Sequence, residues 1–320
     1  MDKLESVWDG TQKDAMRIFL ENAISGGIFA KLTVEEIVSC VLPELVAIAE
    51  EAMPLERIRK ESDIILRAEG PGADHRLPFL SAFNWLTKTA NDRVRAFIRN
   101  ALELFNETDS KRIAHEADLR LSGVAPGSIY IGLKLMLPEK SLLPPDSELG
   151  KRLLETTCRL PLLARCIGDE KILPDIQDVE PDPAMRDAYL ESLFAFAPSG
   201  KHDIHTLTIS SKGHGVARLS QRERVVLRNA LIQPQTKHSM DGEFEGEVRE
   251  ADLDKTRFQL RTKDGVIRCV KPKMQTDEAR KIFGRRIRAR GKYETNREGK
   301  PRLLLVESIE SMPETGRLEL

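Results

Sequence analysis

TRFQLRTKDGVIRCV, residues 256–270, is the stretch that decides the fold of the C-terminal part of the chain. Polar and apolar side chains alternate along TRFQLRT, which predicts a strand with Phe258 and Leu260 facing inward. Asp264-Gly265 is a hairpin turn signal, and VIRCV after it predicts a second strand. The stretch therefore predicts an antiparallel hairpin with one buried face.

Further strand patterns flank this hairpin. FEGEVRE, residues 244–250, predicts a strand before it, and Arg286 to Lys292 and Arg302 to Ile309 predict two strands after it. A short helix is expected between the third and fourth strands, with Thr276 as its N-cap and charges that suit the helix dipole at both ends. Three strands, one helix and two strands is the order of the five-stranded OB (oligonucleotide/oligosaccharide-binding) barrel. A split or SH3-like barrel is the main alternative.

The chain before the barrel mixes hairpins with helices. Ser62 to Ala68 predicts a strand, and apolar positions three and four apart from Pro78 to Phe105 predict a long helix. Residues 118–135 and 203–219 alternate around glycine-containing turns, as hairpins do. Further helices are expected at about 146–166, 183–196 and 221–231. This order favours helices on one face of a mostly antiparallel sheet.

Two stretches set the expected domain boundaries. Residues 12–57 predict helices, with a capping box at Thr33 and Glu36 and a kink at Pro43. IQPQTKHS, residues 232–239, is polar and predicts a linker. We therefore expect an α+β protein made of three parts: a helical extension over residues 1–58, a mixed, mostly antiparallel α+β domain over 59–235, and an OB-like β-barrel over 240–312.

Two motifs carry a resemblance to other proteins. Their sequences in this chain are "LRLSGVAPGSIYIGLKL" and "GEVREADLDKTRFQLRTKDG…RRIRARGKYE". The stretch from about Asp63 to Ile309 resembles a loose group of uncharacterised bacterial proteins with an α+β body and a C-terminal OB-like barrel. The resemblance implies this fold and carries no activity over.

Composition bounds the class of protein. The chain has 320 residues, a formal net charge of −1, 40% hydrophobic residues and 32% charged residues, which is typical of a globular protein. It contains no run of about 18 apolar residues and no signal-peptide pattern, so we expect no membrane contact and a cytoplasmic location. The four cysteines form no C-x-x-C pair, so a zinc ribbon or dithiol redox site is not expected.

The fourth barrel strand carries the strongest candidate site. Strand alternation places Arg286, Arg288, Arg290 and Lys292 in one outward row. The first strand is acidic, so we expect an acidic and a basic side of the barrel. Basic OB barrels bind phosphate backbones by counterion release and base stacking, and Tyr293 is the aromatic that looks free to stack. Cross-strand salt pairs that absorb these charges are the alternative. The candidate nucleic-acid-binding residues are Arg257, Arg261, Arg268, Arg286, Arg288, Arg290, Lys292 and Tyr293.

Templates for catalysis are not found in the sequence. His202 and His205 are three residues apart, so on a strand they would point to opposite faces and make poor paired ligands. The chain has no G-x-S-x-G elbow, no Walker A loop and no H-E-x-x-H motif. We therefore expect no catalytic residue, no metal and no cofactor.

Three functions follow from these patterns. The first is a non-catalytic cytoplasmic binding protein that contacts single-stranded nucleic acid through the basic face of the barrel. The second is a protein-interaction or regulatory subunit that docks a partner through the N-terminal helices or the barrel. The third, least favoured, is an enzyme with a pocket in the α+β domain.

Overall fold

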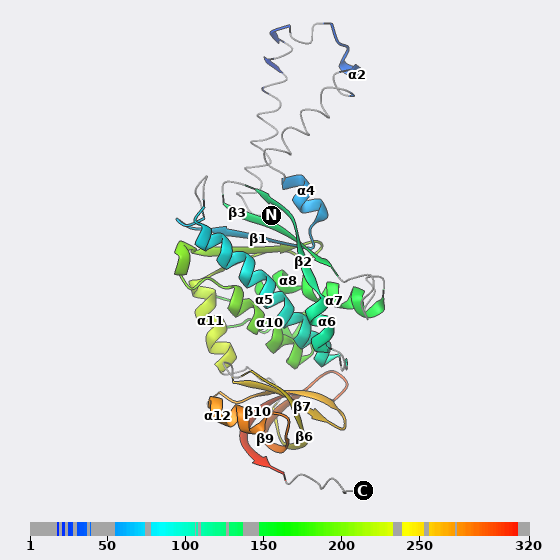
Figure 1. Cartoon of the computed structure of the whole chain (residues 1–320), viewed down its shortest axis with the longest axis vertical. Helices are drawn as coiled ribbons and strands as arrows, with labels where there is room; N and C mark the ends of the chain where they lie inside the picture. Colours follow the sequence, from blue (N-terminus) through cyan, green and yellow to red (C-terminus); the bar gives the residue numbers. More distant parts are fainter. Residues whose placement is uncertain are drawn as a thin grey trace.

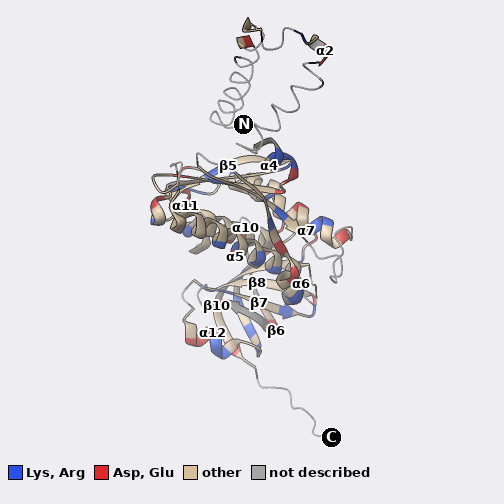
Figure 2. Ribbon diagram, turned by 45° about the horizontal axis from the view of Figure 1, so that its top comes forward, with Lys and Arg blue, Asp and Glu red and all other residues tan. Residues whose placement is uncertain are grey.

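The computed structural model describes residues 55–73, 78–105, 107, 110–125, 128–136, 147–232, 239–252, 256–272 and 274–312, and short pieces at 18, 21–22, 25–27, 31–36 and 39. From residue 55 onward the described chain forms a sheet, a layer of helices and a closed barrel, in that order along the long axis (Figure 1). Figure 2 shows the helices lying between the sheet and the barrel.

The sheet has the strand order β2-β3-β1-β4-β5, and every neighbouring pair is antiparallel. Its apolar side chains face the helices, and Leu66 and Ile131 are fully buried in the core there. Helix α4 packs on the opposite face, where Ile58 contacts Ile65 and Tyr130 in a smaller cluster. The strands are β1 (Ile64–Glu69), β2 (Asp118–Ala125), β3 (Ile129–Met136), β4 (Thr206–Ser211) and β5 (Gly215–Ser220).

The helical layer begins where the sequence provides caps. Asp182 accepts hydrogen bonds from the backbone N–H groups of Ala184 and Met185 at the start of α10, and Ser220 and Glu223 cap α11. The helices are α2 (Val34–Glu36), α4 (Leu55–Glu61), α5 (Leu80–Leu104), α6 (Ser110–Glu116), α7 (Glu148–Cys158), α8 (Leu160–Ala164), α9 (Ile176–Val179), α10 (Pro183–Phe196), the 3-10 turn η2 (Lys201–Asp203) and α11 (Gln221–Ile232).

The C-terminal strands close into a barrel with the order β10-β8-β7-β6-β9, and β9 pairs with β10 to complete it. The helix α12 lies between the third and fourth strands, as predicted for an OB-like barrel. Phe258, Leu260 and Ile287 are among the side chains that fill its own core. The elements are β6 (Met240–Asp252), β7 (Arg257–Thr262), β8 (Gly265–Val270), α12 (Thr276–Ile282), β9 (Arg286–Thr295) and β10 (Pro301–Ser311).

The α+β class, the mostly antiparallel body and the five-stranded barrel are confirmed. The capping box of Thr33 and Glu36 is also confirmed, with hydrogen bonds in both directions. The expected single helix over 146–166 is wrong, because the chain starts a second helix at Leu160, with Pro161 in its first turn. The N-cap of α12 is Gln275 and not Thr276. Pro43 and most of the predicted N-terminal extension lie outside the described residues.

Candidate functional site

The basic strand β9 lies directly beside the acidic strand β6. In this antiparallel pair Glu243 is opposite Arg290, Glu245 is opposite Arg288, and Glu247 is opposite Arg286. The expected separation into an acidic and a basic side of the barrel is therefore wrong. Residues opposite each other in a sheet point to the same face, so acids and bases share the outward surface.

Ion pairs across these strands use part of the basic row. Arg288 donates to Glu245 at 2.7 Å and approaches Glu243 at 3.3 Å. The hydrogen bond from Arg288 lowers the pKa of Glu245 below its ordinary value. Arg286 reaches Glu245 at 3.7 Å, while Arg290 and Lys292 are exposed. The alternative of salt pairs thus accounts for Arg286 and Arg288.

Two of the predicted nucleic-acid residues are buried between the barrel and the helices. Arg257 and Arg268 are 7% and 2% exposed. Arg257 makes a bidentate salt bridge to Asp187, in which its Nε and Nη2 donate to the two carboxylate oxygens at 2.7 Å each. Arg268 donates to the same carboxylate at 2.6 Å. Arg268 also pairs with Glu191. Assigning Arg257 and Arg268 to an outer nucleic-acid surface is therefore wrong, because both are consumed by contacts within the chain.

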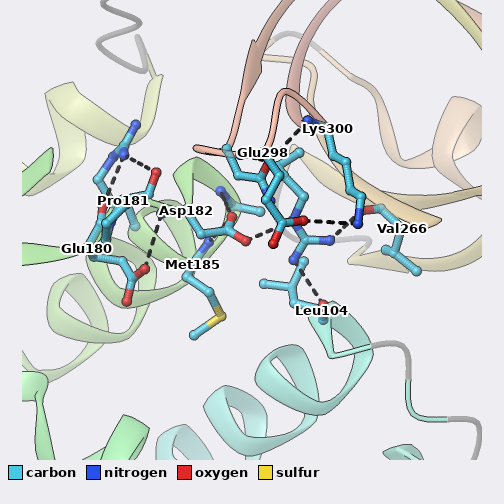
Figure 3. A network of polar contacts seen from close by, with 12 residues as sticks. Leu104, Glu180, Pro181, Asp182, Met185, Val266, Glu298 and Lys300 are labelled. Atoms are coloured by element: carbon cyan, nitrogen blue, oxygen red, sulfur yellow. Dashed lines mark hydrogen bonds and ion pairs between the residues drawn. The ribbon is translucent and has the colours of Figure 1, made fainter. Parts of the chain in front are cut away.

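The buried face of the barrel is the one formed by its second and third strands, the face that OB folds generally offer to oligonucleotides. Arg302 on β10 extends the interface by donating to Asp182 at 2.8 Å and to the backbone carbonyls of Val266 and Leu104 (Figure 3). Arg186 of α10 donates to Glu294 of β9 at 2.5 Å. The barrel is thus held to the body by charged hydrogen bonds of low exposure.

The remaining candidates lie apart from any common site. Arg261 is half-buried on β7, opposite Glu247 of β6. The ring of Tyr293 meets the edge of Phe244 at 5.0 Å and covers the backbone of Gly242. Tyr293 therefore belongs to the packing of the barrel and is not the free stacking residue that its sequence position suggests.

A cleft of about 560 Å³ lies at the junction of helices and barrel. It is bounded by α5, the end of α10, the segment that leads into η2 at Lys201, α11 and the start of β7 at Arg257, with Thr256 just before it. We call it the arginine cleft. Its lining residues are Trp85, Thr89, Arg93, Glu191, Phe194, Ala195, Ala197, Ser199, Lys201, Arg224, Arg228, Leu231, Ile232, Thr256 and Arg257.

Positive charge dominates the arginine cleft. Among the described residues its lining contains five cations and one carboxylate, Glu191, which is paired with Arg268. Within the described residues, Arg93, Arg224 and Arg228 have no carboxylate partner. Burial lowers the pKa of Arg224, and the like charges of Arg93 and Arg228 lower it further. The guanidinium of Arg224 is therefore repelled by those of Arg93 and Arg228, and an anion beside it would relieve that repulsion.

Arg224 is held in place by the chain itself. Its Nη1 donates to the carbonyl oxygens of Phe194 and Ala197, both at 2.7 Å. Its guanidinium lies over the Phe194 ring, 4.1 Å from the centroid. This anchoring fixes the plane of the cation before any ligand arrives, which reduces the ordering cost of binding.

The described part of the chain offers few side chains for metal binding or catalysis. No group of three His, Cys, Asp or Glu side chains there could hold a metal ion. His202 lies in the η2 turn with a φ of 61°, and not on a strand as assumed from its spacing. The described residues that line the arginine cleft include no histidine or cysteine. Among the described residues, no helix is long and apolar enough to cross a membrane.

The sequence contains a local signal for this cleft. Salt-bridged helix residues usually have an opposite charge three or four positions away, as Arg112 has in Glu116. Arg93, Arg224 and Arg228 have no acid at either spacing on their helices. An arginine of this kind is either solvated or available to bind an anion from elsewhere.

Comparisons of the chain with protein-family models, with curated proteins and with solved structures find no match.

Proposed function

We propose that the protein is a binding protein for a phosphate-bearing polyanion, which it holds in the arginine cleft. The observation that carries the proposal is the convergence of Arg93, Arg224 and Arg228 from two helices, without a carboxylate partner among the described residues. Guanidinium groups bind phosphate oxygens through paired N–H donors, and such charge-assisted bonds are the strong ones.

The arginine cleft supports binding better than the barrel strand β9 does. Arg286 and Arg288 already pair with carboxylates of β6, so an anion there would compete with Glu245 and Glu243. Among the described residues no carboxylate neutralises Arg93, Arg224 or Arg228, and Arg93 and Arg224 are partly buried. A lower local dielectric strengthens their attraction for an anion.

Binding and not catalysis is the proposed activity. General acid–base or nucleophilic catalysis needs a titratable or nucleophilic group beside the reacting atoms. Among the described lining residues the one carboxylate is Glu191, which Arg268 engages at the barrel interface. The second expected function, docking of a partner protein, is the outcome that a failed anion-binding experiment would favour.

The experiment is calorimetric titration of the full chain with a short inorganic polyphosphate at about 50 mM salt, where phosphate contacts are weakly screened. The double variant Arg93→Gln/Arg228→Gln removes two cleft charges and spares Arg224, which the fold uses. Arg286→Gln/Arg290→Gln is the matched control, with the same charge change on the barrel.

The cleft variant should bind at least about tenfold more weakly, since one charge-assisted hydrogen bond contributes about 1.5–3 kcal/mol. The barrel variant should stay within about twofold of the wild type, because screening weakens charges beyond a Debye length. Equal losses in both variants, or a wild type that does not bind, would refute the proposal.

A further inference from the structure

Trp85 stands in the same row of the cleft as Arg93. Trp85, Thr89 and Arg93 are four residues apart on α5, so they line one face of that helix. The rise of an α-helix places Trp85 and Arg93 about 12 Å apart along the axis. The wall therefore presents an aromatic ring, a hydroxyl and a cation in sequence.

The facing helix α11 repeats a row of its own. Arg224, Arg228 and Ile232 are also four residues apart, and all three line the cleft. Thr256, the residue before strand β7 of the barrel, lines the same cleft. The cleft thus runs along α11 from the helical body to the barrel.

The two aromatic residues of the cleft, Trp85 and Phe194, differ in what lies on their rings. The guanidinium of Arg224 stacks on the Phe194 ring. Within the described residues, Trp85 makes no contact with another ring or with a cation. Trp85 is partly buried against the core of the body and also lines the cleft, so the part of its side chain on the cleft side is open to a ligand.

A chain of phosphates has no flat group that could stack on an indole, so Trp85 points to a ligand that also carries bases. Proteins that bind single strands combine a positive groove for the backbone with aromatic side chains on which bases stack. In a duplex the base faces are hidden in the stack, so a stacking residue favours a single strand. The volume of about 560 Å³ also lies in the range of small-ligand sites, about 300–1,000 Å³, so the cleft holds a short segment of the strand.

We infer that the polyanion is single-stranded nucleic acid, with a base stacked on the indole of Trp85 and the flanking phosphates on Arg93 and Arg228. This inference rests on the proposed function of the arginine cleft. It adds that the protein recognises bases as well as charge, and that the stacking residue lies on the helical body and not on the barrel.

The test uses the intrinsic fluorescence of the full chain. Trp8 and Trp85 are its two tryptophans, so the variant Trp8→Phe leaves Trp85 as the sole reporter. A single-stranded oligodeoxythymidylate should quench this fluorescence at saturation, because a stacked base contacts the indole directly. A short inorganic polyphosphate should bind and leave the emission nearly unchanged. A duplex of the same length should bind more weakly than the single strand.

Trp85→Leu gives an independent readout, since leucine keeps apolar volume without an aromatic face. Its affinity for the oligodeoxythymidylate should fall roughly 5- to 100-fold, the loss expected for one stacked base. Its affinity for polyphosphate should not change. Because the polyphosphate titration also shows whether this variant is folded, a misfolded protein cannot be mistaken for a loss of stacking.

The outcomes separate the two proposals. Binding of polyphosphate without quenching by the oligonucleotide, or equal affinities of wild type and Trp85→Leu for it, would overturn the single-strand inference and leave the anion cleft standing. A protein that binds neither ligand would overturn the proposed function itself. Tighter binding of the duplex would also overturn the inference and favour a site that reads only the phosphate backbone.

Discussion

Asp187 offers the sharpest test of how the barrel is attached to the body. This carboxylate of α10 is 3% exposed, and it accepts three hydrogen bonds from two guanidinium groups of the barrel. Replacing Asp187 by alanine leaves Arg257 with the Leu231 carbonyl alone and Arg268 with Glu191 alone. One buried positive charge then has no counterion.

The expected magnitude follows from those contacts. Removing one partner of a buried ion pair costs about 3–5 kcal/mol, because the other charge stays buried without compensation. Three charge-assisted bonds at about 1.5–3 kcal/mol each would give a larger sum, but bonds that share one carboxylate are not additive. We therefore expect Asp187→Ala to lower the free energy of unfolding by about 3–5 kcal/mol.

Urea unfolding of the full chain, followed by circular dichroism, measures this loss. Lys292→Ala is the control, because Lys292 is exposed on β9, where it lies opposite Asp241 of β6 and away from Asp187. It should change the stability by less than about 0.5 kcal/mol. If Asp187→Ala were as stable as this control, the buried arginine cluster would not hold the barrel to the body.

Three further predictions concern pH, packing and domain boundaries. Although burial alone would raise the pKa of Asp187, Arg257 and Arg268 hold it well below its ordinary value. The ionised Asp187 with its two arginines therefore stabilises the fold above the pKa of an unfolded carboxyl, about 4. The difference in unfolding free energy between wild type and Asp187→Asn should shrink as the pH falls from about 5 to 2. A constant difference in acid unfolding curves would contradict this. Gly291→Ala should destabilise the barrel by about 1–3 kcal/mol in thermal unfolding, because the added Cβ would stand 2.0 Å from the Leu305 carbonyl oxygen; an unchanged melting temperature would refute the packing argument. Residues 240–312 should unfold cooperatively when expressed alone, since the barrel has its own core, and a disordered fragment would refute the domain boundary.

The secondary structure could be predicted because its causes are local. The three- and four-residue spacing of Leu86, Ala90, Val94 and Phe97 sets the buried face of α5. Asp182 and Pro183 mark the start of α10 without help from the rest of the chain. Strand alternation likewise buries Ile287 and Ala289 on β9.

The charged contacts could not be predicted, because their partners are distant in sequence. Arg288 meets Glu245 across 43 positions, and Arg257 meets Asp187 across 70. A basic residue on a strand has the same local pattern whether it faces solvent, a neighbouring acidic strand or another domain. The pairing of β6 with β9 and the docking of the barrel decide between these, and both depend on the whole fold.

The same reason hides the arginine cleft. Arg93 comes from α5, while Arg224 and Arg228 come from α11, and only the packing of both helices around α10 brings them together. The local signal, a lack of acids at helical spacing, identifies arginines without a partner on their own helix. It cannot show that three of them converge.

The salt dependence of binding tests the central claim most directly. Each phosphate neutralised on a single strand contributes about −0.7 to the slope of log K against log salt concentration. For a single-stranded oligodeoxythymidylate, Arg93→Gln/Arg228→Gln should make this slope shallower by about 1.4, the value for two phosphate contacts. Arg286→Gln/Arg290→Gln should leave it unchanged. A slope that changes only in the barrel variant would contradict the account and return the binding site to strand β9.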